Sequence, residues 1–227
     1  MTVLAIDTAH AAVAVCLMDA KGHVLARDSQ PMARGHAEAL LPAIQRLLDG
    51  AAVQFSQLSR VAVVVGPGSF TGIRIGISAA RGIGLACGIP VVGISSLAAL
   101  AAPLIGSEGT SVIAAAIDAK HGQVYVQGFS PLGQVILTPR IAKIRDAVRS
   151  LGAGQLRLVG SGAAMMAIEA WSMGIEADVV SDAGSPDIAF VARLGLLADP
   201  DGALARPFYL KAPDAKPHFG GLIARTS

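Results

Sequence analysis

The sequence predicts an α/β fold built from two tandem βββαβα units, of which the second is reduced. Hydrophobic residues make up 53% of the 227-residue chain and aromatic residues only 4%, which allows a sizeable core of Ala, Val, Ile and Leu. Three strand-like runs open each half of the chain, and helical and strand-like segments alternate after them. A repeat between the halves is the third observation, and it predicts that they share one topology.

Apolar runs separated by turn residues define the elements of the first unit. We expect strands at 3–7, 11–18, 23–28, 61–65 and 91–94, and helices at 35–48, 71–87 and 96–105. The pattern starts again after the segment 106–109, Gly-Ser-Glu-Gly. This predicts an N-terminal domain at 1–106 and a C-terminal domain at 107–227.

The second unit follows the same order with shorter segments. We expect strands at 111–118, 123–129, 134–137, 156–159 and 179–180, and helices at 141–151, 163–173 and 186–197. In both units the first strand ends on an acid, Asp7 or Asp118. Each of these acids is expected to cap the turn after its strand.

The repeat is visible when residues 5–25 are aligned with residues 116–136, without a gap. Eight of these 21 positions are identical: Ala5/Ala116, Ile6/Ile117, Asp7/Asp118, His10/His121, Val13/Val124, Val15/Val126, Gly22/Gly133 and Val24/Val135. Apolar strands raise such scores, but they do not explain the matched Asp, His and Gly. Two copies of one structural unit are therefore expected.

The block 66–76, Gly-Pro-Gly-Ser-Phe-Thr-Gly-Ile-Arg-Ile-Gly, joins a buried strand to a helix that either Ser69 or Thr71 could cap. Backbone N–H groups at such a helix start suit an anion, so we consider a nucleotide or anion site made by four residues: Asp7, Gly66, Gly68 and Ser69. The block lacks the lysine of a P-loop, and its glycines do not have the dinucleotide-binding spacing. The alternative is a tight turn that only connects the strand to the helix.

Small residues recur at every fourth position of the following helix, at Gly72, Gly76, Ala80 and Gly84. They form a smooth ridge whose glycines each cost up to about 1 kcal/mol of helix stability relative to alanine. Such a ridge predicts a close approach by the domain's own sheet, by another helix or by another subunit. Arg74 and Arg81 lie on a different stripe, where they are expected to meet either water or an acidic partner.

Composition excludes several classes of protein. A net charge of +2, with no basic run longer than a pair, gives no argument for direct nucleic-acid binding. Cys16 and Cys87 stand in apolar surroundings without metal or redox spacing, as buried thiols do in a reducing compartment. The uncharged stretch 82–107 is broken by Gly and Pro, which disfavours a membrane span, and no signal peptide is evident. We therefore expect a cytoplasmic protein.

A doubled βββαβα unit whose first strands end in Asp resembles the actin-like ATPase (ribonuclease H-like) fold. Kinases of this fold position phosphate and Mg²⁺ at these acids, so the resemblance implies that role for Asp7 and Asp118 as the alternative to a turn cap. The sequence is more similar still to the TsaB (YeaZ) family. The blocks that carry this resemblance run through nearly the whole chain: 5–8 (Ala-Ile-Asp-Thr), 36–42 (His-Ala-Glu-Ala-Leu-Leu-Pro), the glycine block 66–76, 116–120 (Ala-Ile-Asp-Ala-Lys) and 207–211 (Pro-Phe-Tyr-Leu-Lys). Of these, the glycine block is the most specific.

The resemblance implies a non-catalytic subunit in the synthesis of threonylcarbamoyladenosine in tRNA. In this family TsaB pairs with the catalytic paralogue TsaD, and the small ATPase TsaE joins them. The contact uses the two helices at 35–48 and 71–87, so the expected partner-binding residues are His36, Leu40, Gly72, Arg74, Ile75, Gly76, Ala80 and Arg81. The resemblance also implies a homodimer when the protein is alone, indirect contact with tRNA, no tightly bound cofactor, and ATP or ADP only at the interface of the complex.

One departure from the paralogue argues against catalysis. TsaD carries a His-x-Glu-x-His metal segment, whereas residues 36–40 here read His-Ala-Glu-Ala-Leu. Leucine cannot ligate a metal, so no metal site is expected. The alternative function is an enzyme of the same superfamily, either an ATP-dependent phosphotransferase or a metallopeptidase.

Overall fold

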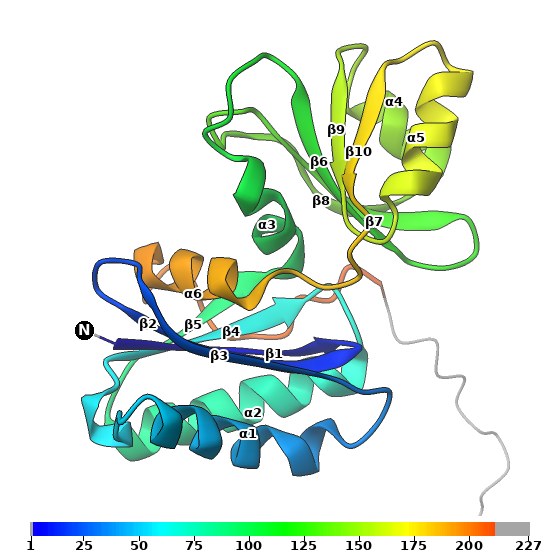
Figure 1. Ribbon diagram of the computed structural model, residues 1–227. Helices are drawn as coiled ribbons and strands as arrows, with labels where there is room; N and C mark the ends of the chain where they lie inside the picture. The colour runs from blue at the N-terminus through cyan, green and yellow to red at the C-terminus, as the bar shows by residue number, and fades with distance from the viewer. Residues whose placement is uncertain (1, 212–227) are drawn as a thin grey trace, which may run out of the picture.

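The computed structural model describes residues 2–211, which form two five-stranded sheets with helices packed against them (Figure 1). The first sheet has the order β3-β2-β1-β4-β5, from β1 (Thr2–His10), β2 (Ala12–Asp19), β3 (Val24–Pro31), β4 (Arg60–Gly66) and β5 (Val91–Ser95). β2 runs antiparallel to β1 and β3, whereas β1, β4 and β5 run parallel. The carboxyl ends of these three parallel strands therefore lie at one edge of the sheet.

The second sheet repeats this topology. Its order is β10-β9-β6-β7-β8, from β6 (Val112–Asp118), β7 (Gln123–Phe129), β8 (Val135–Lys143), β9 (Leu156–Val159) and β10 (Ala177–Ser181). β6 and β7 are antiparallel, as are β7 and β8, and β6, β9 and β10 are parallel. The predicted fold of two tandem actin-like units is therefore confirmed.

Two helices cover one face of each sheet (Figure 1). α1 (His36–Gly50) and α2 (Phe70–Cys87) have 15 and 18 residues, whereas α4 (Ile144–Ser150) and α5 (Ala163–Ser172) have 7 and 10. A short 3₁₀ turn (Phe55–Gln57) lies between α1 and β4. The second unit is thus reduced mainly in its helices, as the shorter segments of its sequence predict.

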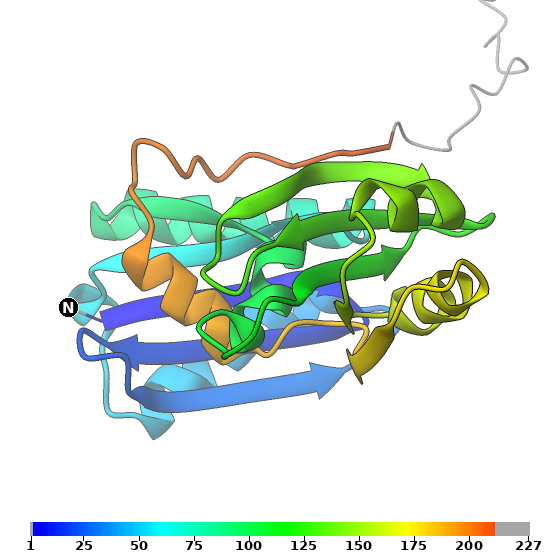
Figure 2. The same ribbon diagram turned by 90° about the horizontal axis from the view of Figure 1, so that it is seen from above.

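The last helix of each unit packs against the sheet of the other unit. α6 (Ile188–Leu197) adds Ile188 and Val191 to the core of the first sheet, on the face opposite α1 and α2 (Figures 1 and 2). α3 (Ser96–Ala101), with the 3₁₀ turn Ala102–Leu104, packs Leu97 and Leu100 against Phe129 and its neighbours in the second sheet. The boundary expected at 106/107 lies between the strands of the two sheets. However, α3 lies before it and packs on the second sheet, and α6 lies after it and packs on the first.

Several predicted bounds are wrong. The first strand, expected at 3–7, continues past Asp7 to His10, and the strand expected at 134–137 continues to Lys143. The helix expected at 141–151 begins only at Ile144, because residues 141–143 extend β8, where Ile141 pairs with Tyr125 and Lys143 with Gln123. Pairing along the whole of β7 overrides the helical preference of this short apolar stretch. Within residues 2–211, no helix is both long and apolar enough to cross a membrane.

Candidate functional site

The glycine turn between β4 and α2 packs against the end of β1. The amide of Ser69 donates to the carbonyl oxygen of Ala9 at 2.8 Å, and the Ser69 hydroxyl accepts from the amide of Gly72 at 3.2 Å. Ser69, not Thr71, is therefore the N-cap of α2. A Cβ on Gly68 would lie 2.5 Å from the carbonyl oxygen of Ala9, so the close approach requires glycine. Because two of its amides are already bonded, the turn matches the tight-turn interpretation better than an anion site.

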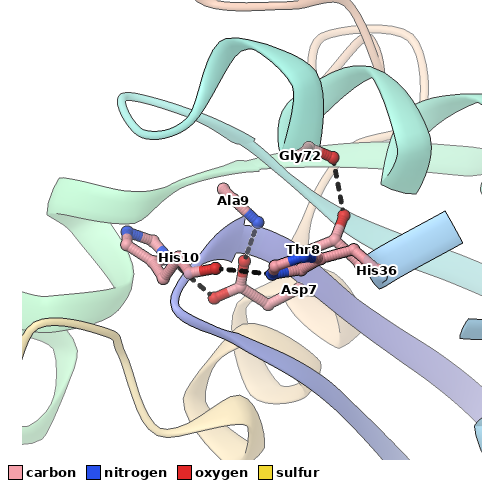
Figure 3. A network of polar contacts seen from close by, with 6 residues as sticks. All are labelled: Asp7, Thr8, Ala9, His10, His36 and Gly72. Atoms are coloured by element: carbon pink, nitrogen blue, oxygen red, sulfur yellow. Dashed lines mark hydrogen bonds and ion pairs between the residues drawn. The ribbon is translucent and has the colours of Figure 1, made fainter. Parts of the chain in front are cut away.

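Asp7 is held within the protein by groups of its own strand, where the β1–β2 pairing is irregular between Asp7 and His10 (Figure 3). One carboxylate oxygen accepts from the amide of Ala9 at 2.8 Å, and the other lies 2.9 Å from Nδ1 of His10. The side chains of Asp7 and His10 are only 3% and 6% exposed. Since the carboxylate is an acceptor, Nδ1 of His10 must carry the proton in this contact. The expected phosphate or Mg²⁺ role of Asp7 gains no support from this geometry.

Two further bonds tie the same part of β1 to the helices. The hydroxyl of Thr8 donates to the carbonyl oxygen of Gly72 at 2.7 Å, and Nε2 of His36 lies 3.0 Å from the carbonyl oxygen of His10 (Figure 3). Thr8 comes from β1, Gly72 from the first turn of α2, and His36 is the first residue of α1. His36 is therefore half-buried and bonded to the end of β1.

The small-residue ridge of α2 faces the protein's own sheet. Gly72, Gly76, Ala80 and Gly84 are all buried. A Cβ on Gly76 would lie 2.6 Å from Oγ1 of Thr8, and one on Gly72 would overlap the Thr8 carbonyl oxygen. The prediction that Gly72, Gly76 and Ala80 bind a partner is therefore wrong, because β1 and β4 already occupy that face of the helix.

The C-terminal segment of the described chain runs alongside β5 and covers the glycine turn. The amide of Gly93 donates to the carbonyl oxygen of Ala203 at 2.8 Å. The amide of Phe208 donates to the carbonyl oxygen of Val65, also at 2.8 Å. A Cβ on Gly66 would lie 3.0 Å from the carbonyl oxygen of Phe208. The blocks 66–76 and 207–211, which are far apart in the sequence, thus form one structural feature.

The two arginines of α2 bind this C-terminal segment. Arg81 donates from Nη2 to the carbonyl oxygen of Ala205 at 2.7 Å, and Arg74 donates from Nε to the hydroxyl of Tyr209 at 3.0 Å. Tyr209 stacks on Phe70 with 4.8 Å between ring centroids, and the guanidinium of Arg74 lies 3.8 Å from the centre of the Phe70 ring. Both expectations for these arginines, water or an acidic partner, missed this intramolecular contact.

The faces of α1 and α2 that do not meet the sheet form an apolar groove. It consists of two hollows of about 540 and 770 Å³ that share Leu41 and Ala79. Their lining residues are Ala37, Leu40, Leu41, Phe70, Thr71, Arg74, Ile75, Ser78 and Ala79 in one, and Leu41, Phe55, Ser56, Ala79, Gly82, Ile83, Ala86 and Cys87 in the other. Leu41 is 56% exposed and Leu85, further along α2, 87%. We call this surface the α1–α2 groove.

Among the predicted partner-binding residues, Leu40, Arg74 and Ile75 line the groove. Sequence reasoning missed Leu41, Phe70 and Ala79 as members of this surface. The apolar stripe of the first helix includes Leu41, but the stripe alone does not separate a leucine in the core from one that remains exposed.

The remaining candidate residues form no second site. Asp118 accepts from the amide and the ammonium group of Lys120 at 2.8 and 2.7 Å, and chiefly the Lys120 side chain lowers the pKa of this carboxyl below its ordinary value. Burial raises the pKa of the Cys16 thiol to about 11, so this thiol stays protonated at neutral pH. Within residues 2–211, no group of three or more His, Cys, Asp or Glu side chains is placed to hold a metal ion.

Comparison with known proteins identifies the family. The family model described as TsaD, tRNA N6-adenosine threonylcarbamoyltransferase, matches residues 29–191. The TsaB protein of Buchnera aphidicola is 35% identical over 169 residues, which cover 70% of this chain and 78% of the relative. The TsaB protein of Escherichia coli is 38% identical over 125 residues, 55% of this chain. That match spans about half of the relative's length (53%).

Solved structures agree with the sequence comparison. YeaZ from Pseudomonas aeruginosa superposes with a TM-score of 0.71 at 29% identity, over 92% of this chain and 99% of that one. A second structure from the same organism, described as an uncharacterized protein with similarity to peptidase YeaZ, has a TM-score of 0.73 at 26% identity with the same coverage. Since the family model covers more than half of the chain and a named relative aligns over most of its length, the chain belongs to the TsaB (YeaZ) family.

Proposed function

We propose that this protein is a non-catalytic subunit of the machinery that makes threonylcarbamoyladenosine in tRNA, and that it acts by binding a TsaD-like catalytic paralogue. The relatives named TsaB are described as tRNA threonylcarbamoyladenosine biosynthesis proteins, which supports the process. The non-catalytic role is supported by Asp7, whose two carboxylate oxygens are both engaged inside the protein. Leu40, which stands at a metal-ligand position of TsaD, is buried and apolar.

The α1–α2 groove is the observation that carries this proposal. It leaves apolar side chains of two long helices exposed, including Leu41 at its centre, where both hollows meet. Burying such a surface against a partner gains about 25 cal/mol per Å² of apolar area. A paralogue built from the same unit carries an equivalent helix pair, so two helix pairs can pack together. Arg74 lies at the rim, where a charge contributes more to orientation than to affinity.

The proposal includes the other partners that the family resemblance implies. A second copy of this chain would use the α1–α2 groove as well, so a homodimer and the heterodimer compete. A TsaE-like small ATPase joins the pair, with ATP or ADP at the interface of the complex. Contact with tRNA is indirect and runs through the paralogue, because the net charge of +2 provides no strong attraction to phosphate.

The test is to mix the purified protein with TsaD from the same source and to measure the mass by light scattering during gel filtration. We expect a stable mixed species for the wild type and its loss for Leu41→Glu, which places a charge in the groove. Leu132→Glu is the matched control, because Leu132 is 82% exposed in a turn of the second unit. Separate elution of the wild-type proteins, with and without TsaE and nucleotide, would refute the proposal, and so would normal binding by Leu41→Glu.

The enzymatic alternative has its own readout. An ATP-dependent phosphotransferase or a metallopeptidase needs a complete nucleotide or metal site. Stoichiometric metal in the purified protein, or a turnover that Asp7→Ala abolishes, would favour it over the binding role.

A further inference from the structure

The end of β1 makes direct bonds to the first residues of both helices that form the α1–α2 groove. Thr8 donates through its hydroxyl to the carbonyl oxygen of Gly72 in α2, at 2.7 Å. The carbonyl oxygen of the next residue, Ala9, accepts from the amide of Ser69, the N-cap of α2, at 2.8 Å. The carbonyl oxygen of the following residue, His10, lies 3.0 Å from Nε2 of His36, the first residue of α1. Three consecutive residues thus hold two helix starts that are separated by more than 30 residues of chain.

The Asp7–His10 pair fixes the shape of the last, irregularly paired part of β1, which we refer to below as the turn. Asp7 binds the amide of Ala9 on one side and the ring of His10 on the other. These two bonds restrict the peptide units whose carbonyl oxygens face Ser69 and His36. Figure 3 shows the two carboxylate contacts and the helix contacts of Thr8 and His36 arranged around one turn. The turn is therefore a rigid support for the helices.

Thr8 and Asp7 are too deeply buried to touch a partner at the groove, whereas His36 is half-buried. Thr8 is 1% exposed and Asp7 is 2% exposed. The groove begins at the helix starts that they hold, because Ala37 of α1 and Phe70 and Thr71 of α2 all line it. A shift of either helix start would change the distance between these lining residues without changing their chemistry.

We propose that Thr8 and His36 are positioning residues that set the spacing of α1 and α2, and thereby the affinity of the α1–α2 groove for its partner. This inference rests on the proposed function, in which the partner is a TsaD-like paralogue. Thr8 acts only through Gly72, and His36 acts through the carbonyl group of His10. The support at the end of β1 thus gives the strand-end acid a mechanical role in place of a phosphate or metal role.

The experiment compares two pairs of variants in the full chain. Thr8→Val keeps the shape and removes the hydroxyl, whereas Thr8→Ser keeps the hydroxyl. His36→Ala removes the donor, whereas His36→Gln places an amide donor near the position of Nε2. We measure the dissociation constant for purified TsaD by calorimetry, and hydrogen exchange of the amides in the first turns of α1 and α2 in the free protein. We expect Thr8→Val and His36→Ala to weaken binding about five- to twenty-fold and to speed exchange at both helix starts, while Thr8→Ser and His36→Gln stay within about two-fold of the wild type.

The outcomes separate this inference from the proposed function. Failure of the wild type to bind TsaD would refute the proposed function. The hydrogen-exchange data would then still show whether Thr8 and His36 hold the first turns of α1 and α2 in place. If the wild type binds and Thr8→Val binds equally well, with unchanged exchange, the positioning role is refuted. Weaker binding by His36→Ala with normal exchange at both helix starts would also refute it, because His36 would then act by direct contact.

Discussion

The two units of this protein begin with matching strands that carry the same acid, but the acid has different surroundings in each. β1 continues past Asp7 to His10, and Asp7 is buried and paired with His10 in the strand end that bonds to α1 and α2. β6 ends on Asp118, which is paired with Lys120, whose side chain is 77% exposed. The turn that follows also contacts helix starts, because the amide of Asp118 donates to the hydroxyl of Ser161 before α5, and the amide of Ile144, the first residue of α4, donates to the carbonyl oxygen of Gly122. The repeated motif thus contacts helices in both units, but its acid is buried in the first unit and partly exposed, with an exposed partner, in the second.

The matched histidines and glycines of the repeat show the same contrast. His10 is buried against Asp7, whereas His121 is exposed in a left-handed conformation with φ 55°. Gly22 and Gly133, however, keep one role, because each has φ near +80° (83° and 82°) in the turn of the second hairpin. The positive φ that favours glycine thus occurs in both units, whereas the matched histidines lie in different surroundings.

The largest expected effect concerns the packing of α2 on the first sheet. Gly76→Val should lower the free energy of unfolding by about 3 kcal/mol or more, because its Cβ would meet Thr8 and Val63 at 2.6 and 3.3 Å. Gly82→Ala on the exposed side of the same helix has nothing within 4 Å and should raise it by about 0.5–1 kcal/mol. Denaturant unfolding measures both changes. Equal effects at the two positions would show that the ridge is not packed on the sheet.

The second prediction compares the two strand-end acids directly. Asp7→Ala should cost about 2–4 kcal/mol of unfolding free energy, because it leaves the buried Ala9 amide and His10 ring without their acceptor. Asp118→Ala should cost less than about 1 kcal/mol, since its partner is exposed. Unfolding of both variants in the same buffer tests the difference. Similar costs would mean that the burial of Asp7 and His10 adds no stability beyond that of the partly exposed Asp118 pair.

Most of the fold is predictable from the sequence because apolar periodicity and turn residues mark nearly every strand and helix. The repeat is equally visible, since Asp118 and Gly133 recur at a fixed distance from Asp7 and Gly22. The sequence did not predict which segments far apart in the chain pair or pack with one another. Residues 141–143 are strand because β7 pairs with them, and the sheet on which the helix ending at Leu197 packs is not given by its place in the chain.

The candidate site was predicted less well, for a similar physical reason. A stripe of small residues indicates close packing, but it does not say against what, and here β1 and β4 fill the contact. Arg74 and Arg81 look available on a helical wheel, yet a segment more than 120 residues away returns to bind both of them. The family resemblance pointed to the two helices that form the α1–α2 groove, while their exposed side was found only in the structure.

The smallest expected effect concerns the pH dependence of the Asp118 turn. The Lys120 side chain lowers the pKa of Asp118 in the folded state, so the folded protein binds fewer protons at this site than the unfolded chain does. The resulting stability is present above the unfolded pKa of about 3.9 and is lost as the pH falls through the lower folded pKa. Because the pair is exposed, it contributes less than about 1 kcal/mol and weakens in salt.

Lys120→Met tests this interpretation, since it removes the ammonium group and keeps the backbone bond from residue 120. The pKa of Asp118, followed by carboxyl-carbon NMR, should rise toward its ordinary value but stay below it, because the amide of residue 120 still donates to the carboxylate. Asp19 is an internal control, because its lowered pKa depends on His23 and should not move. An unchanged pKa at Asp118 would assign the shift to the backbone of the turn. The acids of both units would then share a main-chain donor two residues further along the chain, and the contrast between them would reduce to burial and to the ring of His10 in the first unit.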